Sequence, residues 1–315
     1  MGHTSKDEQG TDAESTRNGI DRRRVLQGVA AGTVTVAGLS VTSGSAVAQG
    51  EDRLDGNCPA IPFGAPEDFP TVDLTGDSPT ASNVPAGQEE VVFFLHGWLE
   101  AFTGGAVNQS VALQEALAQN GKDVPVVAAK WPANSPNWFG QKDVSEQAGA
   151  DLGSYLTDYT DANPDTTIRV VGHSLGGRGV YDMLDSAQYD TTVQSVSALG
   201  AAVNPVTVCD DGRFGAAIAD GAEEVYNYHS EGDDIVCTIY DIPEGPSGVG
   251  CSGSDCPTGF FGLDDGQPDN YTDVDVTGTV ENHCDYFRPD VGCVDLVVND
   301  WSDPDDDGGF FGGLF

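Results

Sequence analysis

The amino-acid sequence predicts an α/β fold, in which helices flank an open and mostly parallel sheet. Two observations lead to this prediction. Short, continuous apolar runs such as residues 90–95 are typical of strands buried on both faces. Between these runs, apolar residues recur at helical spacing, as they do from Val107 to Ala118. Strands that alternate with helices favour a parallel sheet.

The elements follow one another along the chain at regular intervals. A helix is predicted after the first strand from the apolar stripe formed by Val107, Val111, Leu113 and Leu117. Gly121 is expected to end this helix. Later strands are predicted at residues 124–129, 167–171, 193–199, 224–228 and 271–276. Later helices are predicted at residues 144–159, after residue 174 as far as Leu184, and at residues 291–301.

The N-terminus has the pattern of an export signal. Residues 22–26 form a twin-arginine sequence, a Gly- and Ala-rich apolar run continues to Val41, and residues 46–48 supply an A-x-A cleavage site. We therefore expect residues 1–48 to be a twin-arginine signal peptide and the protein to be secreted.

The rest of the chain is expected to form one main domain with extensions. Residues 49–88 are predicted to be an irregular leader, residues 89–302 the main domain, and residues 303–315 an acidic and aromatic tail. Loop insertions near residues 206–221 and 237–269 are expected to form a cap. The tail begins with the D-x-D-x-D-G spacing of a calcium loop, but its twelfth position is Leu314 instead of Glu, so no metal site is predicted.

The charge balance excludes several classes of protein. The net charge is −38, and residues 49–315 hold 46 acidic side chains against eight basic ones. Nucleic-acid binding is not expected, because it needs basic side chains to neutralise phosphates. No apolar stretch long enough to span a membrane follows the signal peptide. Because molar salt screens self-repulsion of this size, the composition indicates adaptation to high salt.

All seven cysteines lie after the signal peptide, so disulfide bonds are expected in an exported protein. Six of them can pair and one would remain. The local pairs Cys251–Cys256 and Cys284–Cys293 are favoured, although spacing alone does not fix the connectivity.

Catalytic chemistry is indicated by the G-x-S-x-G motif at residues 172–176. The motif lies between a predicted strand and a predicted helix, where it forms a sharp turn that exposes the serine. Gly172 and Gly176 allow the turn, and Ser174 is the candidate nucleophile.

A serine nucleophile needs a base and an acid to orient that base. His283 is the candidate base, because it lies late in the chain on a loop after the strand at residues 271–276. His173 is expected to pack away from the site, and His229 to be a structural neighbour. Asp233 follows the strand at residues 224–228 and is the preferred acid, with Asp234 as the alternative.

Two backbone N–H groups are expected to form an oxyanion hole. One belongs to Leu175, directly after the nucleophile. The other belongs to Trp98, in the loop that begins with His96 and Gly97 after the first strand. Gly97 would let this loop approach the nucleophile closely.

Residues 95–98, 129–131 and 172–176 resemble those of the α/β-hydrolase superfamily, and of its lipase branch in particular. The resemblance implies a lipase- or esterase-like serine hydrolase that cleaves carboxylic esters through an acyl-enzyme at Ser174, with Asp233 and His283. One feature departs from pancreatic-type lipases, whose acid follows the strand after the nucleophile helix. Here residues 199–202 at that place hold no carboxylate, so the acid is expected one strand later.

The expected substrate is a small-molecule or lipid ester, with no cofactor. Two alternatives stay open. The same residues suit another acyl substrate, such as a polyester, a thioester or a peptide bond. Alternatively, the fold can serve a non-catalytic binding protein.

Overall fold

The structure is a computed structural model that describes residues 64–98, 105–239, 248–257 and 266–302. The chain divides into two units, Met1–Ala48 and Gln49–Phe315, and all described residues belong to the second. The expected signal peptide and the C-terminal tail with its calcium-like spacing lie outside the described residues, as does the leader before residue 64.

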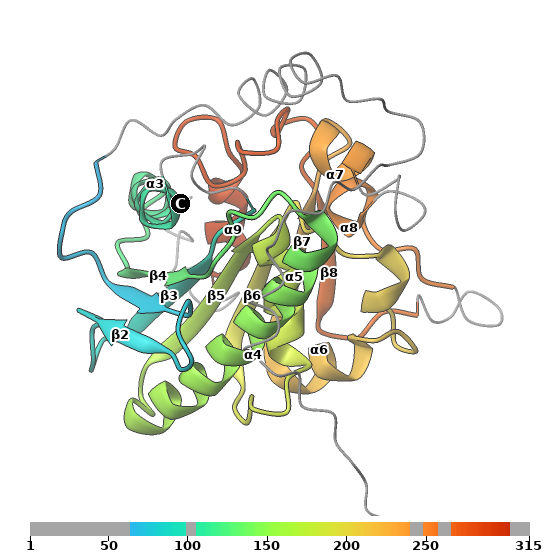
Figure 1. Cartoon of the computed structure of the whole chain (residues 1–315). Helices are drawn as coiled ribbons and strands as arrows, with labels where there is room; N and C mark the ends of the chain where they lie inside the picture. The colour runs from blue at the N-terminus through green and yellow to red at the C-terminus, as the bar shows by residue number, and fades with distance from the viewer. Residues whose placement is uncertain (1–63, 99–104, 240–247, 258–265, 303–315) are drawn as a thin grey trace, which may run out of the picture. The chain divides into compact units, whose positions relative to one another are not determined.

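An eight-stranded sheet forms the centre of the described residues (Figure 1). Its strands lie in the order β2-β1-β4-β3-β5-β6-β7-β8, and every neighbouring pair is parallel except β1 and β2. The strands are β1 (Thr71–Asp73), β2 (Thr80–Ser82), β3 (Glu90–Leu95), β4 (Val126–Lys130), β5 (Thr167–His173), β6 (Val193–Leu199), β7 (Ala222–His229) and β8 (Tyr271–Asp275). Parallel pairing brings the C-terminal ends of β3, β5, β6 and β7 to one edge of the sheet.

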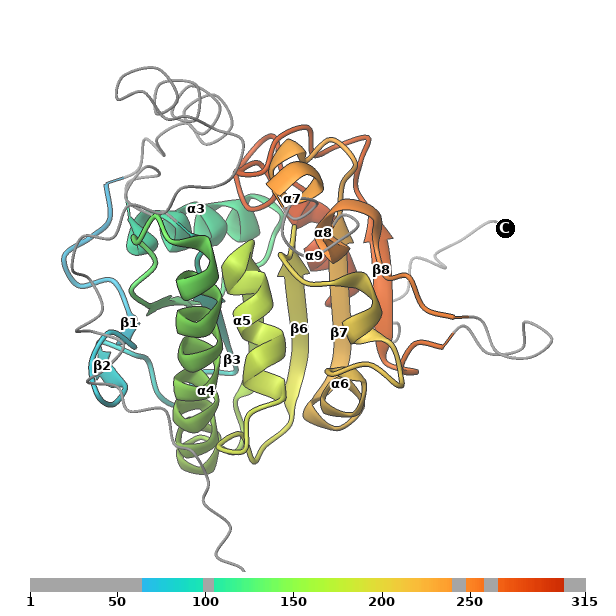
Figure 2. The ribbon, with the colours of Figure 1, turned by 45° about the vertical axis from the view of Figure 1, so that its right-hand side comes forward.

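Helices cover both faces of the sheet, which is the expected arrangement for parallel strands (Figure 2). The helices are α3 (Ala106–Gln119), α4 (Trp138–Ala162), α5 (Leu175–Leu184), α6 (Gly215–Gly221), α7 (Asp234–Ile239), α8 (Val249–Ser252) and α9 (Val294–Asp300), and a 3-10 helix η2 spans Pro205–Val208. Alternate side chains of β3 pack on the two opposite faces of the sheet. Phe93 packs in a core with α4, α5 and α6, whereas Phe94 packs in a core with α3 and α9.

The predicted α/β architecture is confirmed, and all six predicted strands and four predicted helices are present. The elements that were not predicted are short. Strands β1 and β2 fall within the leader that was expected to be irregular, and η2, α6, α7 and α8 fall within or beside the expected insertions. None of these six elements exceeds seven residues, which is too short for a periodic pattern to show. Of the described residues, none form a helix that is long and apolar enough to cross a membrane.

The favoured local disulfide pairs are wrong. Cys251 pairs with Cys237, because its helix α8 packs against α7. Cys256 pairs with Cys209, at the end of η2, with a Cα–Cα distance of 5.4 Å. Cys284 is also in a disulfide bond, whereas Cys293 is a buried free thiol. Tertiary packing decided the pairing, and spacing along the chain did not.

Candidate active site

Ser174 lies at the turn between β5 and α5 and has a strained backbone. Its φ and ψ angles are 58° and −121°, a region that side chains other than glycine rarely adopt. Three hydrogen bonds hold the turn. The Ser174 N–H donates to the Leu199 carbonyl at 3.0 Å, and the Ser174 carbonyl accepts from the N–H groups of Arg178 and Ala202, both at 3.1 Å. The serine is buried, with 7% of its surface exposed.

The two glycines of the motif provide space around this turn. A Cβ atom on Gly176 would lie 2.0 Å from the carbonyl oxygen of Leu95, at the end of β3, and one on Gly172 would lie 2.5 Å from the Gly176 carbonyl oxygen. Both contacts are shorter than any tolerated by real side chains. The start of α5 can therefore press against the end of β3, and this brings the loop after β3 to the nucleophile.

Gly97 lies in that loop, close to the serine. A Cβ atom at this position would lie 3.1 Å from the Cβ atom of Ser174 and 2.9 Å from Nδ1 of His173. The absence of a side chain lets the peptide that joins Gly97 to Trp98 run beside the nucleophile. This is the position expected for an oxyanion-hole donor.

His96 fixes the orientation of this loop. The Trp131 N–H donates to Nε2 of His96 at 3.2 Å, so Nε2 is the acceptor and Nδ1 carries the proton. Nδ1 lies 2.9 Å from the Gly97 carbonyl oxygen and donates to it. The Trp131 indole N–H in turn donates to the His96 carbonyl at 2.9 Å. Because C=O and N–H point in opposite directions across a trans peptide, holding the Gly97 carbonyl also fixes the direction of the Trp98 N–H.

Leu175 begins α5 and is fully buried. The N–H groups of the first helical turn have no acceptor within the helix and carry the positive end of its dipole. The Leu175 N–H therefore has the properties of the second oxyanion donor that the sequence predicts.

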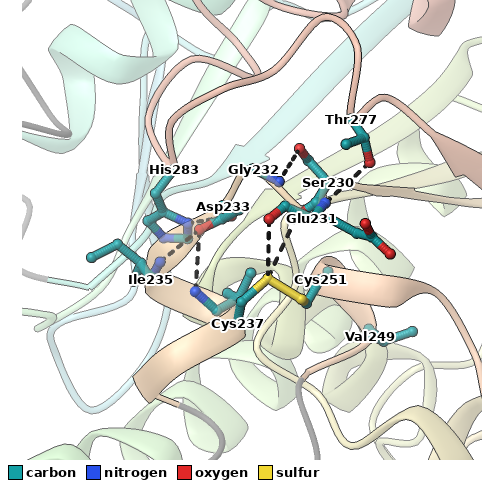
Figure 3. The surroundings of a disulfide bond; sticks show 12 residues. Ser230, Glu231, Gly232, Asp233, Ile235, Cys237, Val249, Cys251, Thr277 and His283 are labelled. Carbon is teal, nitrogen blue, oxygen red and sulfur yellow. Dashed lines mark hydrogen bonds and ion pairs between the residues drawn. A yellow bond between two sulfur atoms is a disulfide. The ribbon is translucent and has the colours of Figure 1, made fainter.

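Asp233 and His283 form a hydrogen-bonded pair, although they lie 50 residues apart in the chain (Figure 3). His283 Nδ1 lies 2.7 Å from Asp233 Oδ2, and the two residues are 5% and 0% exposed. The carboxylate comes from the loop after β7, and the imidazole from the loop after β8. A buried carboxylate on Nδ1 leaves Nε2 of the ring available to accept a proton.

The second carboxylate oxygen of Asp233 caps helix α7. Oδ1 accepts hydrogen bonds from the N–H groups of Ile235 and Val236, at 3.0 and 3.1 Å. Asp234 is the first residue of α7 and is exposed to solvent. The structure thus brings Asp233, and not its neighbour, to His283.

The loops that carry the acid and the base are tied to each other. The Ser230 hydroxyl donates to the Val280 carbonyl at 2.6 Å. The carbonyl of Gly250, in α8, accepts from both the Ser230 N–H at 3.0 Å and the buried Tyr286 hydroxyl at 3.2 Å, and so joins the two loops indirectly. Burial, followed by the negative charge of Asp233, raises the pKa of Tyr286 well above its usual range. Neither residue could be predicted from the sequence, because single hydroxyl groups in loops carry no recognisable pattern.

The other histidines fall in different places. His173 is buried, in agreement with its predicted packing role, but it does not point away from the candidate base, because its ring lies 4.6 Å, centroid to centroid, from that of His283. His229 is half-buried beside Gly253, next to the carboxylate of Asp273. The residues predicted for the site thus lie on the loops that follow β3, β5, β7 and β8. Within the described residues, no group of three or more His, Cys, Asp or Glu is arranged to hold a metal ion.

Sequence comparison gives a family for part of the chain. Residues 81–204 match a family model described as an alpha/beta hydrolase of unknown function (DUF900). The matched segment includes Gly97 and the turn at Ser174. Together with the strand order, this match identifies the fold as an α/β-hydrolase fold, as the sequence predicts. No curated protein matches the sequence.

Solved structures of low sequence identity are also similar. The poly(3-hydroxybutyrate) depolymerase LpqC from Bordetella parapertussis is 13% identical, with 81% of this chain and 96% of that chain covered and a TM-score of 0.41. For esterase PE8 the identity is 16%, the covered shares are 50% and 77%, and the TM-score is 0.34. An extracellular alpha/beta-hydrolase from a Paenibacillus species is 14% identical, with a TM-score of 0.26, and the similarity covers 40% of this chain and less than half, 44%, of that protein.

Proposed function

We propose that this protein is a secreted serine hydrolase that cleaves carboxylic esters, with Ser174 as nucleophile, His283 as base and Asp233 as the acid that orients it. The observation that carries the proposal is the buried Asp233–His283 pair, joined at 2.7 Å, on the same edge of the sheet as a strained serine turn. Either feature alone occurs in proteins without catalytic function. Their occurrence together, in this chain order, is typical of acyl-transfer enzymes.

In the proposed mechanism, His283 Nε2 accepts the proton of the Ser174 hydroxyl as Oγ attacks the ester carbonyl carbon. The N–H groups of Leu175 and Trp98 stabilise the negative charge that develops on the carbonyl oxygen. The imidazolium of His283 then gives its proton to the departing alcohol, which leaves an acyl-enzyme. Water, activated by the same imidazole, hydrolyses the acyl-enzyme and restores Ser174. Asp233 stays ionised and stabilises the imidazolium.

Export and salt adaptation belong to the same proposal. Disulfide bonds such as Cys209–Cys256 and Cys237–Cys251 suit an oxidising compartment, and the twin-arginine sequence suggests the route. The net charge of −38 suits a medium of high ionic strength. The proposed ester is a small molecule or a lipid, and the shape of the substrate pocket determines which of the two is bound.

A serine-directed phosphonate probe tests whether the site is catalytic. The probe should add covalently to Ser174 in the folded protein, as seen by intact mass and peptide mapping. Ser174→Ala should abolish the adduct, and Ser110→Ala, at a buried serine of α3, should leave it unchanged. If the folded wild-type protein gives no adduct, a non-catalytic binding protein becomes the better account.

The nature of the acyl substrate needs a separate comparison. A matched p-nitrophenyl ester and p-nitroanilide of the same short acid should be hydrolysed at very different rates, with the ester preferred. If the anilide is cleaved as fast as the ester, the peptide-bond alternative replaces ester cleavage.

A further inference from the structure

His173 stands immediately before the nucleophile and lies against the loop that carries the candidate base. It is the last residue of β5, and its side chain is 2% exposed. Its Nε2 atom lies 2.7 Å from the backbone carbonyl oxygen of His283. The two imidazole rings are 4.6 Å apart, centroid to centroid. His173 therefore contacts both the backbone and the ring of the residue that must face Ser174.

The hydrogen bond fixes the tautomer of His173. A carbonyl oxygen can only accept, so Nε2 must carry the proton and donate it. Burial, and then the neighbouring His283 ring, hold the pKa of His173 well below its usual range, so the ring is neutral and Nδ1 bears a lone pair. Nδ1 accepts no hydrogen bond from the described residues. Among the described residues, His173 therefore makes this contact through Nε2 as donor, with the His283 carbonyl oxygen as acceptor.

The other sides of the His173 ring are closed. Phe287 packs edge-on against it, with ring centroids 4.9 Å apart, and the Tyr286 ring lies beside it at 6.1 Å. On the side of Nδ1, a Cβ atom at Gly97 would lie only 2.9 Å away. The ring is therefore held in place between the loop after β3 and the loop after β8, and it cannot rotate without displacing one of them.

We propose that His173 is a positioning residue, which sets the place of His283 relative to Ser174 through the hydrogen bond from Nε2 to the His283 carbonyl. The proposal rests on the proposed function, since it assigns to His173 the alignment of the base with the nucleophile. The Asp233 carboxylate orients the His283 ring, and His173 holds the backbone from which that ring extends. Because His173 and Ser174 are consecutive, one short segment carries both the nucleophile and the support of its base.

Three substitutions separate this role from simple filling of space. His173→Gln carries an amide N–H at about the position of Nε2 and should still reach the His283 carbonyl. His173→Asn is also an amide but is one methylene shorter, so its N–H falls short. His173→Leu fills the space without any donor. Each variant is first checked for folding by circular dichroism and thermal unfolding in high salt.

We expect kcat for a p-nitrophenyl ester to fall about 10- to 100-fold in the Leu and Asn variants, with KM nearly unchanged, because a small displacement of the base slows the chemical step and leaves substrate binding intact. The Gln variant should recover most of the lost kcat. As a matched control, His229→Leu removes a half-buried histidine outside the site and should keep the wild-type kcat. Wild-type kcat in folded His173→Leu, or equal losses in the Gln and Asn variants, would overturn the proposal.

A second measurement does not depend on turnover. The proton shared by Asp233 and His283 should give a far-downfield proton resonance, assigned by its loss in Asp233→Asn. The resonance should shift or broaden in His173→Leu and His173→Asn but persist in His173→Gln and His229→Leu. An unchanged resonance in all four variants would contradict the positioning role. Failure of the proposed function is seen separately, as full ester hydrolysis by Ser174→Ala.

Discussion

At the scale of single residues, Asp233 uses its two carboxylate oxygens for two different tasks. Oδ2 binds the imidazole of His283 at 2.7 Å, while Oδ1 caps the N-terminus of α7 through two backbone N–H groups. The cap fixes the side chain in the orientation that presents Oδ2 to His283. Asp234, one residue later, is exposed and points its charge into solvent.

This difference predicts unequal effects at two adjacent aspartates. Asp233→Asn should lower kcat by about 10³- to 10⁴-fold, because the amide no longer favours the proton on Nδ1 or stabilises the imidazolium. Asp234→Asn should leave kcat little changed. Steady-state kinetics on a p-nitrophenyl ester checks both. A larger loss in Asp234→Asn than in Asp233→Asn would show that the acid is assigned to the wrong residue.

The candidate site residues could be predicted where a sequence pattern marks them, and contacts that depend only on packing could not. The G-x-S-x-G turn and the residues after β3 are marked by glycines and strand ends. Asp233 could be preferred over Asp234 only weakly, because both follow the same strand, and the geometry of the cap separates them. The contact of His173 with His283 joins residues 110 positions apart, which no local pattern reveals.

At the scale of elements, an ion-pair cluster attaches the segment before α6 to helix α5. Arg213 precedes α6, and its guanidinium lies 3.0 Å from Oδ1 of Asp182 and 3.1 Å from Oδ2 of Asp185. Arg178 approaches the other oxygen of Asp182 at 3.6 Å. Asp182 itself is buried, and burial raises its pKa to about 7 in spite of the two arginines.

The raised pKa of Asp182 predicts how stability changes with pH. Between about pH 4 and about pH 7 the unfolded chain releases this proton while the folded protein keeps it, so the free energy of unfolding should fall as pH rises, by up to about 1.4 kcal/mol per pH unit. Above pH 7 the contribution is constant. Asp182→Asn should lack this slope. Denaturant unfolding at constant molar salt across the range checks it, and parallel curves for the two proteins would contradict it.

The long elements were predictable and the short ones were not, for a physical reason. β3 is a continuous apolar run from Val91 to Leu95, and α3 and α4 are long enough to show a helical stripe. β1, β2 and α8 have three or four residues and form because the elements around them provide partners. The disulfide bonds follow the same rule, since Cys237 and Cys251 meet only when α7 packs on α8.

At the scale of the whole molecule, the main feature is the large excess of negatively charged side chains. The net charge is −38, and after residue 48 acidic side chains outnumber basic ones by 46 to eight. In dilute buffer these charges repel one another and oppose the compact state. The Debye length falls from about 10 Å at 0.1 M salt to about 3 Å at 1 M, so concentrated salt removes most of this repulsion.

We therefore expect the protein to lose structure and activity on dialysis from multimolar salt into dilute buffer, and to recover both when salt is restored. Circular dichroism and ester hydrolysis, measured over a series of KCl concentrations, check this. Sucrose at equal osmolality is the control, because it strengthens burial without screening charge. Full folding and activity in dilute buffer would rule out salt adaptation.

In the proposed reaction, Ser174 carries an acyl group during hydrolysis of an ester. The most direct test compares wild type with Ser174→Ala in high salt, on p-nitrophenyl esters that range from acetate to palmitate. We expect the wild type to hydrolyse at least one ester and a folded Ser174→Ala variant to hydrolyse none. The acyl chain length that the wild type prefers then separates an esterase from a lipase. Equal hydrolysis by the two proteins, or none by a folded wild type on any ester, would contradict the proposed reaction.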